Sequence, residues 1–259
     1  MIGNRLKRSA YLGVALFFAG IGVAKAGDMP DLPAASEWQG DLTLYGWYGL
    51  PSGQLGVRGY GPWDIPSNSN TNILDVLNGF FMATGELKDG RFGILGDFLW
   101  ADFGERKTGP KGFLSASVGL SGAVGTAAGT YTLLQSDVGN LEALAGVRVW
   151  GMDASADFTT AGGISRSVDH ELTWFDPLVG LKGRYLLSPD WFLSGAAAIG
   201  GFGAGSKFMY DANAVIGYNF NDHISASLGY RVIGVDYRRN GTIIDAVMHG
   251  PVAGLTARF

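Results

Sequence analysis

The chain has 259 residues and no cysteine, which excludes disulfide frameworks and thiolate metal sites. Only 16% of the residues are charged, well below the roughly 25% of an average soluble domain, and 42 residues are glycine. The formal net charge is −4, and a chain with this acidic balance is a poor partner for nucleic acid.

The first 26 residues have the three parts of a secretory signal peptide. These parts are a basic start, an apolar stretch and two small residues at a cleavage site: Arg5, Lys7 and Arg8, residues 10–23, and Ala24 with Ala26. We expect cleavage after Ala26, which leaves residues 27–259 as the mature domain. A retained membrane anchor is the alternative, but the apolar stretch is short for a membrane span. Cleavage removes four basic residues and no acid, so the mature chain has 15 basic and 23 acidic residues and a net charge of −8.

Alternation of apolar and polar residues predicts ten β-strands along the mature chain. The clearest example is 208–232, where both arms of a tight Asn-Asp turn alternate and therefore predict an antiparallel hairpin. In chain order, the predicted strands are 41–50, 79–87, 91–105, 123–136, 141–153, 174–187, 191–200, 208–220, 224–232 and 244–259. Glycine and alanine weaken the pattern of 123–136, so eight strands are the alternative.

The segments between these strands differ in length and composition. Residues 51–72 are rich in Gly, Pro, Ser and Asn, and they are predicted to form a long loop. Residues 72–78 either begin the second strand, which we favour, or form a short helix. Residues 107–112 and 159–170 are predicted to be polar loops. The predicted tight turns are 88–91, 137–140, 188–190 and 221–222. Tight turns that alternate with other connections indicate an outer-membrane β-barrel whose turns and termini are periplasmic.

The apolar face of the predicted strands is expected to meet lipid. It carries aromatic residues near strand ends, as in the two interfacial girdles of membrane barrels. These residues are Tyr48, Trp100, Phe175, Tyr185, Trp191, Tyr210 and Phe220. The opposite face is rich in Gly, Ser, Ala and Asn and poor in charge, which suits a crowded lumen better than a solvated exterior. A soluble ligand-binding barrel with its apolar face inside is an alternative interpretation.

The last predicted strand ends in Phe259, with Gly254 five positions before it. This pair resembles the C-terminal assembly signal of Gram-negative outer-membrane barrels, in which a bulkier residue usually stands in place of Ala257. The further motifs are Trp174-Phe175-Asp176-Pro177 with Gly180, Gly200-Gly201-Phe202-Gly203, Gly229-Tyr230-Arg231 and Gly250-Pro251. With these motifs, the mature chain resembles the small outer-membrane β-barrel proteins of the OmpA-transmembrane-domain and opacity-protein type. The resemblance implies an integral outer-membrane protein, with membrane lipid and the barrel-assembly machinery as partners, and it supplies no catalytic residue and no cofactor.

The inward register of the predicted strands gathers charged residues in the lumen. The candidate site residues are Asp97, Glu142, Arg148, Asp176, Lys182, Arg184, Asp211 and Arg231, joined by Asp41, Glu86 and Arg258. Charges removed from bulk water must be paired. The six acids and five bases are nearly balanced, which favours an internal ion-pair network that fills a narrow barrel. A constriction that selects small solutes by charge is the functional alternative.

Two histidines are candidates for catalysis: His249, on the outward register, and His170, in a predicted loop beside Asp169. A barrel enzyme that cuts lipids or peptides needs a nucleophile or water beside a base and an orienting group. Neither histidine has such partners on its strand face, apart from Asp245 four residues before His249. The sequence therefore predicts an outer-membrane barrel with a structural or narrow-channel role and no catalytic site. An outer-membrane barrel enzyme that acts on lipid or peptide is the alternative.

Overall fold

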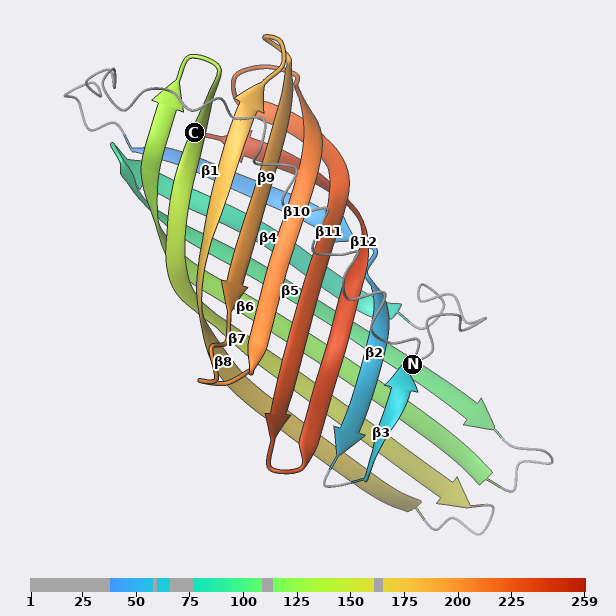
Figure 1. The fold of residues 1–259 in the computed structure, drawn as a ribbon. Coiled ribbons are helices and arrows are strands. Elements are labelled where there is room, and N and C mark those ends of the chain that lie inside the picture. Colours follow the sequence, from blue (N-terminus) through green and yellow to red (C-terminus); the bar gives the residue numbers. More distant parts are fainter. Residues whose placement is uncertain (1–37, 58–59, 66–76, 109–113, 161–164) are drawn as a thin grey trace.

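The computed structural model describes residues 38–57, 60–65, 77–108, 114–160 and 165–259 (Figure 1). All regular structure in these residues is antiparallel β-sheet. The strands are β1 (Gln39–Trp47), β2 (Leu50–Val57), β3 (Tyr60–Ile65), β4 (Leu77–Asp89), β5 (Phe92–Thr108), β6 (Leu114–Ser136), β7 (Gly139–Thr160), β8 (Ser165–Leu186), β9 (Trp191–Gly200), β10 (Phe208–Asn219), β11 (Ile224–Arg239) and β12 (Thr242–Arg258). In the described part of the chain, no helix is both long and apolar enough to span a membrane.

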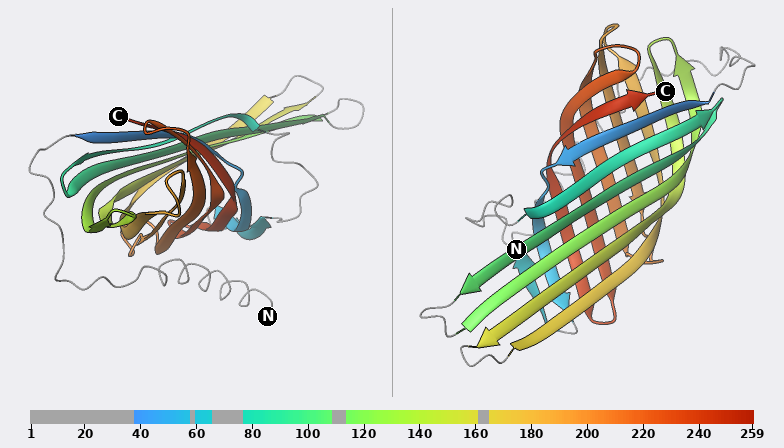
Figure 2. Two further views of the ribbon diagram at one scale, coloured as in Figure 1. Left: turned by 90° about the horizontal axis from the view of Figure 1, so that it is seen from above. Right: turned by 180° about the vertical axis from the view of Figure 1, so that it is seen from behind.

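Ten of these strands close into a barrel, as the sequence predicts. From β4 to β12 each strand pairs with the next in chain order, and β1 pairs with both β4 and β12. The closing ladder runs from Asp41 opposite Arg258 to Trp47 opposite Val252. Figure 2 shows the curved sheet from above and from behind. A closed antiparallel barrel leaves few backbone groups without a partner, which is the requirement for a sheet surrounded by lipid.

The two ends of the barrel differ in their connections. The tight turns that join β4 to β5, β6 to β7, β8 to β9 and β10 to β11 lie at one end. The chain ends of the barrel lie there too, because the backbone of Gly40 exchanges two hydrogen bonds with Phe259. Short turns mark the periplasmic end of an outer-membrane barrel, so the turn that joins β11 to β12 lies at the outer end.

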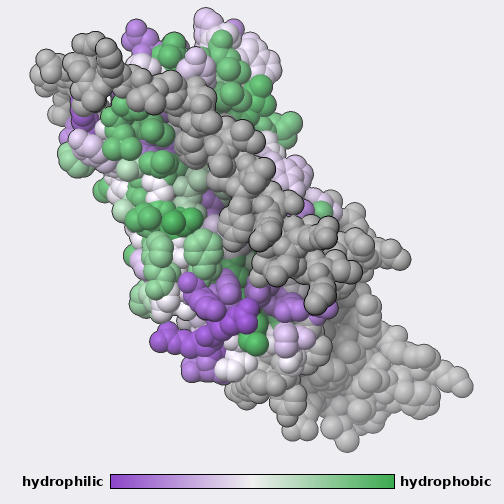
Figure 3. All heavy atoms as spheres, viewed as in Figure 1, coloured by the Kyte–Doolittle hydropathy of each residue, from purple (hydrophilic) through white to green (hydrophobic). Residues whose placement is uncertain are grey.

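The exterior of the barrel carries an apolar band. Its members are exposed although they are large and hydrophobic, and they include Leu44, Ile94, Phe98, Val147, Val149, Phe175, Val179, Ile216, Leu228 and Leu255. On β7 the outward residues are apolar or glycine from Leu141 to Gly151, and Asp153 follows. Asp153 lies beside Glu171 on β8, so carboxylates bound the band at its outer edge. Figure 3 shows hydrophobic side chains over the middle of one face and a hydrophilic patch near the β11–β12 turn. This distribution excludes the soluble barrel, whose apolar face would line a cavity.

A charge placed within this band tests its assignment to lipid. We expect Val147→Arg to lower the free energy of unfolding by roughly 2–4 kcal/mol in lipid vesicles, because arginine is costly near the bilayer midplane. Val138→Arg is the matched control, since Val138 is 48% exposed and Val147 is 43% exposed, but Val138 lies in a periplasmic turn. Urea titrations of the refolded barrel give both values. Equal losses for the two variants would contradict a lipid-facing band.

The prediction of a long loop at residues 51–72 is wrong for residues 51–57 and 60–65, which belong to strands β2 and β3. Strand β2 continues β1 and pairs with the outer half of β12, from Leu50 opposite His249 to Gly56 opposite Ile243, and β3 folds back on β2 as a short hairpin. Proline and glycine hide the alternation in this segment. Pro51 is tolerated because it precedes Gly53, where the pairing of β2 with β3 begins, so no described strand pairs with Pro51 on that side. Gly53 is required, because its φ is +131° and a Cβ atom there would lie 2.0 Å from the carbonyl oxygen of Asp245. Residues 66–76, with most of the ambiguous segment 72–78, lie outside the described residues.

Strands β5 to β8 are longer than predicted, and the polar loops at 107–112 and 159–170 are partly strand. The ladder between β7 and β8 continues to Thr159 opposite Ser165. From Asp153 to Thr160 the rise of a strand adds about 20 Å beyond the apolar band. We call the parts of β5, β6, β7 and β8 that extend beyond the apolar band the overhang; on β7 it comprises residues 153–160 (Figure 1). Sequence patterns miss it because outside the membrane neither face of a strand must be apolar.

Candidate functional site in the barrel lumen

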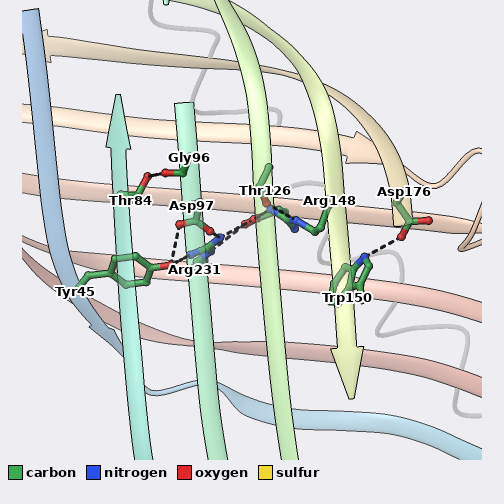
Figure 4. Close-up of polar contacts among 10 residues, drawn as sticks. Tyr45, Thr84, Gly96, Asp97, Thr126, Arg148, Trp150, Asp176 and Arg231 are labelled. Carbon is green, nitrogen blue, oxygen red and sulfur yellow. Dashed lines mark hydrogen bonds and ion pairs between the residues drawn. The ribbon is translucent and has the colours of Figure 1, made fainter. Parts of the chain in front are cut away.

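A hydrogen-bonded layer crosses the middle of the lumen (Figure 4). We call it the central layer, and its members are Tyr45 on β1, Asp97 on β5, Arg231 on β11, Asp211 on β10 and Arg148 on β7. Arg231 donates through Nε and Nη2 to the two carboxylate oxygens of Asp211, at 3.1 and 2.8 Å. The same Nη2 lies 3.0 Å from Asp97 Oδ1, and Nη1 donates to Tyr45 Oη at 2.8 Å. Arg148 donates to Asp211 Oδ2 at 2.6 Å. Side chains from five strands thus meet across the lumen.

The register of the sheet brings these side chains to one height. Asp97 lies opposite Thr126, and Thr126 lies opposite Arg148. Arg148 donates to Thr126 Oγ1 at 2.9 Å, which holds its guanidinium in position. Both Arg148 and Arg231 are buried, and each has an acidic partner, as buried charges require.

A second group of charges lies on the periplasmic side of the central layer. Lys88 forms ion pairs with Glu86 and Glu142, and Lys182 forms ion pairs with the same two acids. Thr130 donates to Glu86 Oε1 at 2.7 Å, and the amide of Asn140 donates to Glu142 Oε1 at 2.7 Å. Two acids and two bases therefore neutralise one another in this group.

Asp176 is fully buried, and its hydrogen-bond partners are all uncharged. It accepts hydrogen bonds from the backbone N–H and the hydroxyl of Ser206, both at 2.6 Å, and from the indoles of Trp150 at 2.9 Å and Trp174 at 3.3 Å. The two indole rings stack with centroids 5.5 Å apart. Ser206 belongs to the segment between β9 and β10, so this carboxylate fastens that connection to β8.

The outer half of the lumen is filled by apolar side chains. This outer cluster includes Trp47, Met82, Leu99, Trp150, Trp174, Met209, Ile233, Tyr237 and Ile244. Met209 is completely buried, and Trp174 packs on Tyr237 with ring centroids 4.5 Å apart. The outer cluster lies on the outer side of the central layer.

A cavity of about 330 Å³ occupies the periplasmic half of the lumen. Small residues of β9, namely Ser194, Ala196 and Ala198, leave room for it. Its lining reaches from the periplasmic mouth up to the central layer. Four other members of the buried hydrophobic core line it, namely Ala128, Leu144, Leu178 and Val252, whereas the residues named in the outer cluster do not. The cavity thus ends where the central layer begins.

The eight predicted site residues all lie in the lumen, but they form separate groups. Asp97, Arg148, Asp211 and Arg231 meet in the central layer, whereas Glu142 and Lys182 belong to the periplasmic group. Asp176 lies apart from both groups and accepts hydrogen bonds from Trp150 and Trp174. Arg184 lies at the periplasmic mouth. The sequence predicts Lys88 in a tight turn and does not assign it to the lumen. Lys88 lies two positions after Glu86, so the alternation of a strand would have placed both side chains on the same inward face. Ser206 carries no sequence signal, because a loop positions it.

The remaining predicted residues are not brought together into a site. His249 faces outward on β12, and its Nδ1 lies 2.6 Å from the hydroxyl of Tyr230. The side chain of His170, and Ala24 and Ala26 of the expected cleavage site, lie outside the described residues. Gly254 and Phe259 occupy the periplasmic half of β12 and its end, and their role as an assembly signal stays a prediction. The described residues contain no group of three or more His, Asp or Glu side chains that could hold a metal ion.

The similarity to one solved structure supports the fold. No family model and no curated protein matches the chain. The solved structure of the outer membrane protease OmpT from Escherichia coli is similar with a TM-score of 0.57 and 13% identity, and the match covers 90% of this chain and 99% of that chain. The translocator domain of the autotransporter NalP from Neisseria meningitidis matches with a TM-score of 0.41 and 12% identity, over 98% of this chain and 95% of that chain. The chain is an outer-membrane β-barrel protein, and its apolar exterior places it in the bacterial outer membrane.

Proposed function

We propose that the chain is a structural outer-membrane barrel whose lumen does not let solutes pass. The observation that carries this proposal is the central layer, in which charged side chains from opposite walls hydrogen-bond to one another. Ion pairs that satisfy each other leave no charge free to replace the hydration shell of a passing ion. The narrow-channel alternative requires these pairs to separate while both members are buried, which is costly.

The outer cluster adds a second closure in series with the central layer. Apolar side chains packed between the layer and the outer end exclude water, and an ion cannot leave water without a polar partner. The cavity ends below both closures. The barrel then serves as an anchor that holds the overhang outside the membrane. Membrane lipid around the apolar band and the barrel-assembly machinery are its proposed partners.

The environment of His249 favours a role without catalysis. Its hydrogen-bond partner is a tyrosine hydroxyl, and Asp245, the one acid that the sequence analysis noted near it, forms an ion pair with Arg238 at 3.1 Å. A hydrolytic site needs a nucleophile or water held by a base and an orienting acid. The Tyr230–His249 pair supplies neither a serine nor a carboxylate among the contacts of the described residues.

Release of small solutes from vesicles tests the proposal. We expect vesicles that contain the refolded barrel to swell in isotonic glycine or arabinose no faster than protein-free vesicles. Vesicles that contain a general porin at the same protein ratio provide the positive control. Swelling at a rate that rises with the amount of folded barrel and falls with solute size would show a channel and overturn the proposal.

A further inference from the structure

Two arginines at the periplasmic mouth of the lumen differ from the other lumen bases. Lys88, Lys182, Arg148 and Arg231 each form an ion pair with an acid. Arg184 and Arg258, near the periplasmic ends of β8 and β12, form none with any described residue. Arg184 donates to the side-chain oxygen of Asn219 at 2.9 Å, and Arg258 donates to the same oxygen at 3.2 Å. One neutral acceptor therefore holds two cations close together.

The arginine pair is fixed by its neighbours. Arg258 also donates to Ser225 Oγ at 3.0 Å. The guanidinium carbon of Arg184 lies 3.4 Å from the ring centroid of Phe192, and that of Arg258 lies 6.0 Å from the same centroid. The ring itself rests on Gly217, where a Cβ atom would lie 2.0 Å from it. The aromatic face of Phe192, the shared acceptor Asn219 and the hydroxyl of Ser225 keep the guanidinium groups in place, which lowers the entropy lost when they bind a ligand.

Within the described residues, the pair uses only a small part of its hydrogen-bonding capacity. A guanidinium has five N–H donors, whereas the side chain of Arg184 makes one hydrogen bond and that of Arg258 makes two to described residues. Both residues line the 330 Å³ cavity. Asp41 lies opposite Arg258 in the closing ladder, yet it forms no ion pair with either arginine among the described residues. Two cations that repel each other in a half-buried site attract a doubly charged anion.

We propose that Arg184 and Arg258 form an anion-binding site at the periplasmic mouth, which takes the phosphate group of a small solute. Arginine matches phosphate oxygens with paired N–H groups, and two such residues suit a dianion. The cavity behind the pair accommodates the uncharged remainder of a small phosphate ester. The phosphate group has two sources. One is a free monoester in the periplasm, whose phosphate is a dianion, and the other is a phospholipid headgroup of the inner leaflet, whose phosphodiester carries a single negative charge.

Calorimetric titration of the full barrel in a zwitterionic detergent, at low ionic strength, tests the site with inorganic phosphate and glycerol 3-phosphate. We expect saturable binding of both. Arg184→Gln and Arg258→Gln should each weaken binding about tenfold or more, and the double variant should abolish it. Asp41→Asn should strengthen binding, because it removes a nearby negative charge. Arg239→Gln, an exposed arginine at the outer end, is the matched control and should bind as the wild type does.

Chemical protection gives a readout that does not depend on the folding of a variant. Phenylglyoxal modifies accessible arginines, and we expect inorganic phosphate to protect Arg184 and Arg258 but not Arg239. In phosphatidylglycerol vesicles without added phosphate, protection of the pair would identify the lipid headgroup as the source, and phosphatidylcholine vesicles are the neutral comparison. Absence of saturable binding to the wild type, or equal binding to the double variant confirmed as folded by heat-modifiable migration, would overturn the proposal.

Discussion

Replacing Arg231 with methionine will destabilise the barrel by about 3–5 kcal/mol, since it removes one member of a buried ion-pair network. Methionine keeps much of the side-chain volume but leaves Asp97 without a cation and takes one of two arginines from Asp211. Urea unfolding of the refolded barrel, followed by tryptophan fluorescence, measures the loss. Arg239→Met is the control for a change of charge at an exposed position.

A double variant separates the stability lost through an unpaired buried charge from the stability lost through poorer packing. Arg231→Met leaves Asp97 as a charged acid without a cation. In Asp97→Asn/Arg231→Met this acid is replaced by a neutral amide, so we expect the double variant to lose less stability than the sum of the two single losses. If Arg231→Met and Arg239→Met differ by less than about 1 kcal/mol, the central layer does not stabilise the barrel.

Replacing Asp176 with alanine will cost roughly 3 kcal/mol or more, because its buried hydrogen-bond donors lose their acceptor. Ser206 loses the partner of its backbone N–H, and Trp150 loses the acceptor for its indole. The connection between β9 and β10 is then no longer fastened to β8. We therefore expect faster proteolysis at residues 201–207 in addition to a lower free energy of unfolding.

Two comparisons make this result specific to the buried carboxylate. Asp190→Ala changes an exposed aspartate in a periplasmic turn and should leave both stability and proteolysis unchanged. Asp176→Asn keeps one acceptor oxygen and should fall between the wild type and Asp176→Ala. Equal stability of Asp176→Ala and Asp190→Ala would mean that the carboxylate does not hold the connection.

The membrane-spanning part of the fold could be predicted from sequence because lipid imposes a strict rule on it. Every second residue must be apolar, as in 141–149 and 208–220, and the strand count follows from such segments. The rule does not predict two parts of the fold, namely strand β2 and the overhang. In β2, Pro51 and Gly53 obscure the alternation, and the strand there is apparent only from its pairing with β12 and β3. In the overhang, water on both sides removes the requirement for an apolar face.

The lumen could be predicted as a set of residues but not as a set of contacts. Alternation places Arg148 and Asp176 on the inward face, and they are direct neighbours in the β7–β8 ladder. Arg148 nevertheless pairs with Asp211, which is 63 positions further along the chain, whereas Asp176 binds Ser206. Which partner a charge selects depends on the curvature of the barrel and on side-chain packing, and neither has a signature in one sequence.

The electrical conductance of a planar bilayer tests most directly whether the lumen is closed. The barrel inserted from folded, heat-modifiable protein should give no current steps above those of the detergent control, at either polarity and in concentrated potassium chloride. Stable, uniform steps that scale with salt concentration and that disappear with heat-denatured protein would contradict a central layer that closes the lumen.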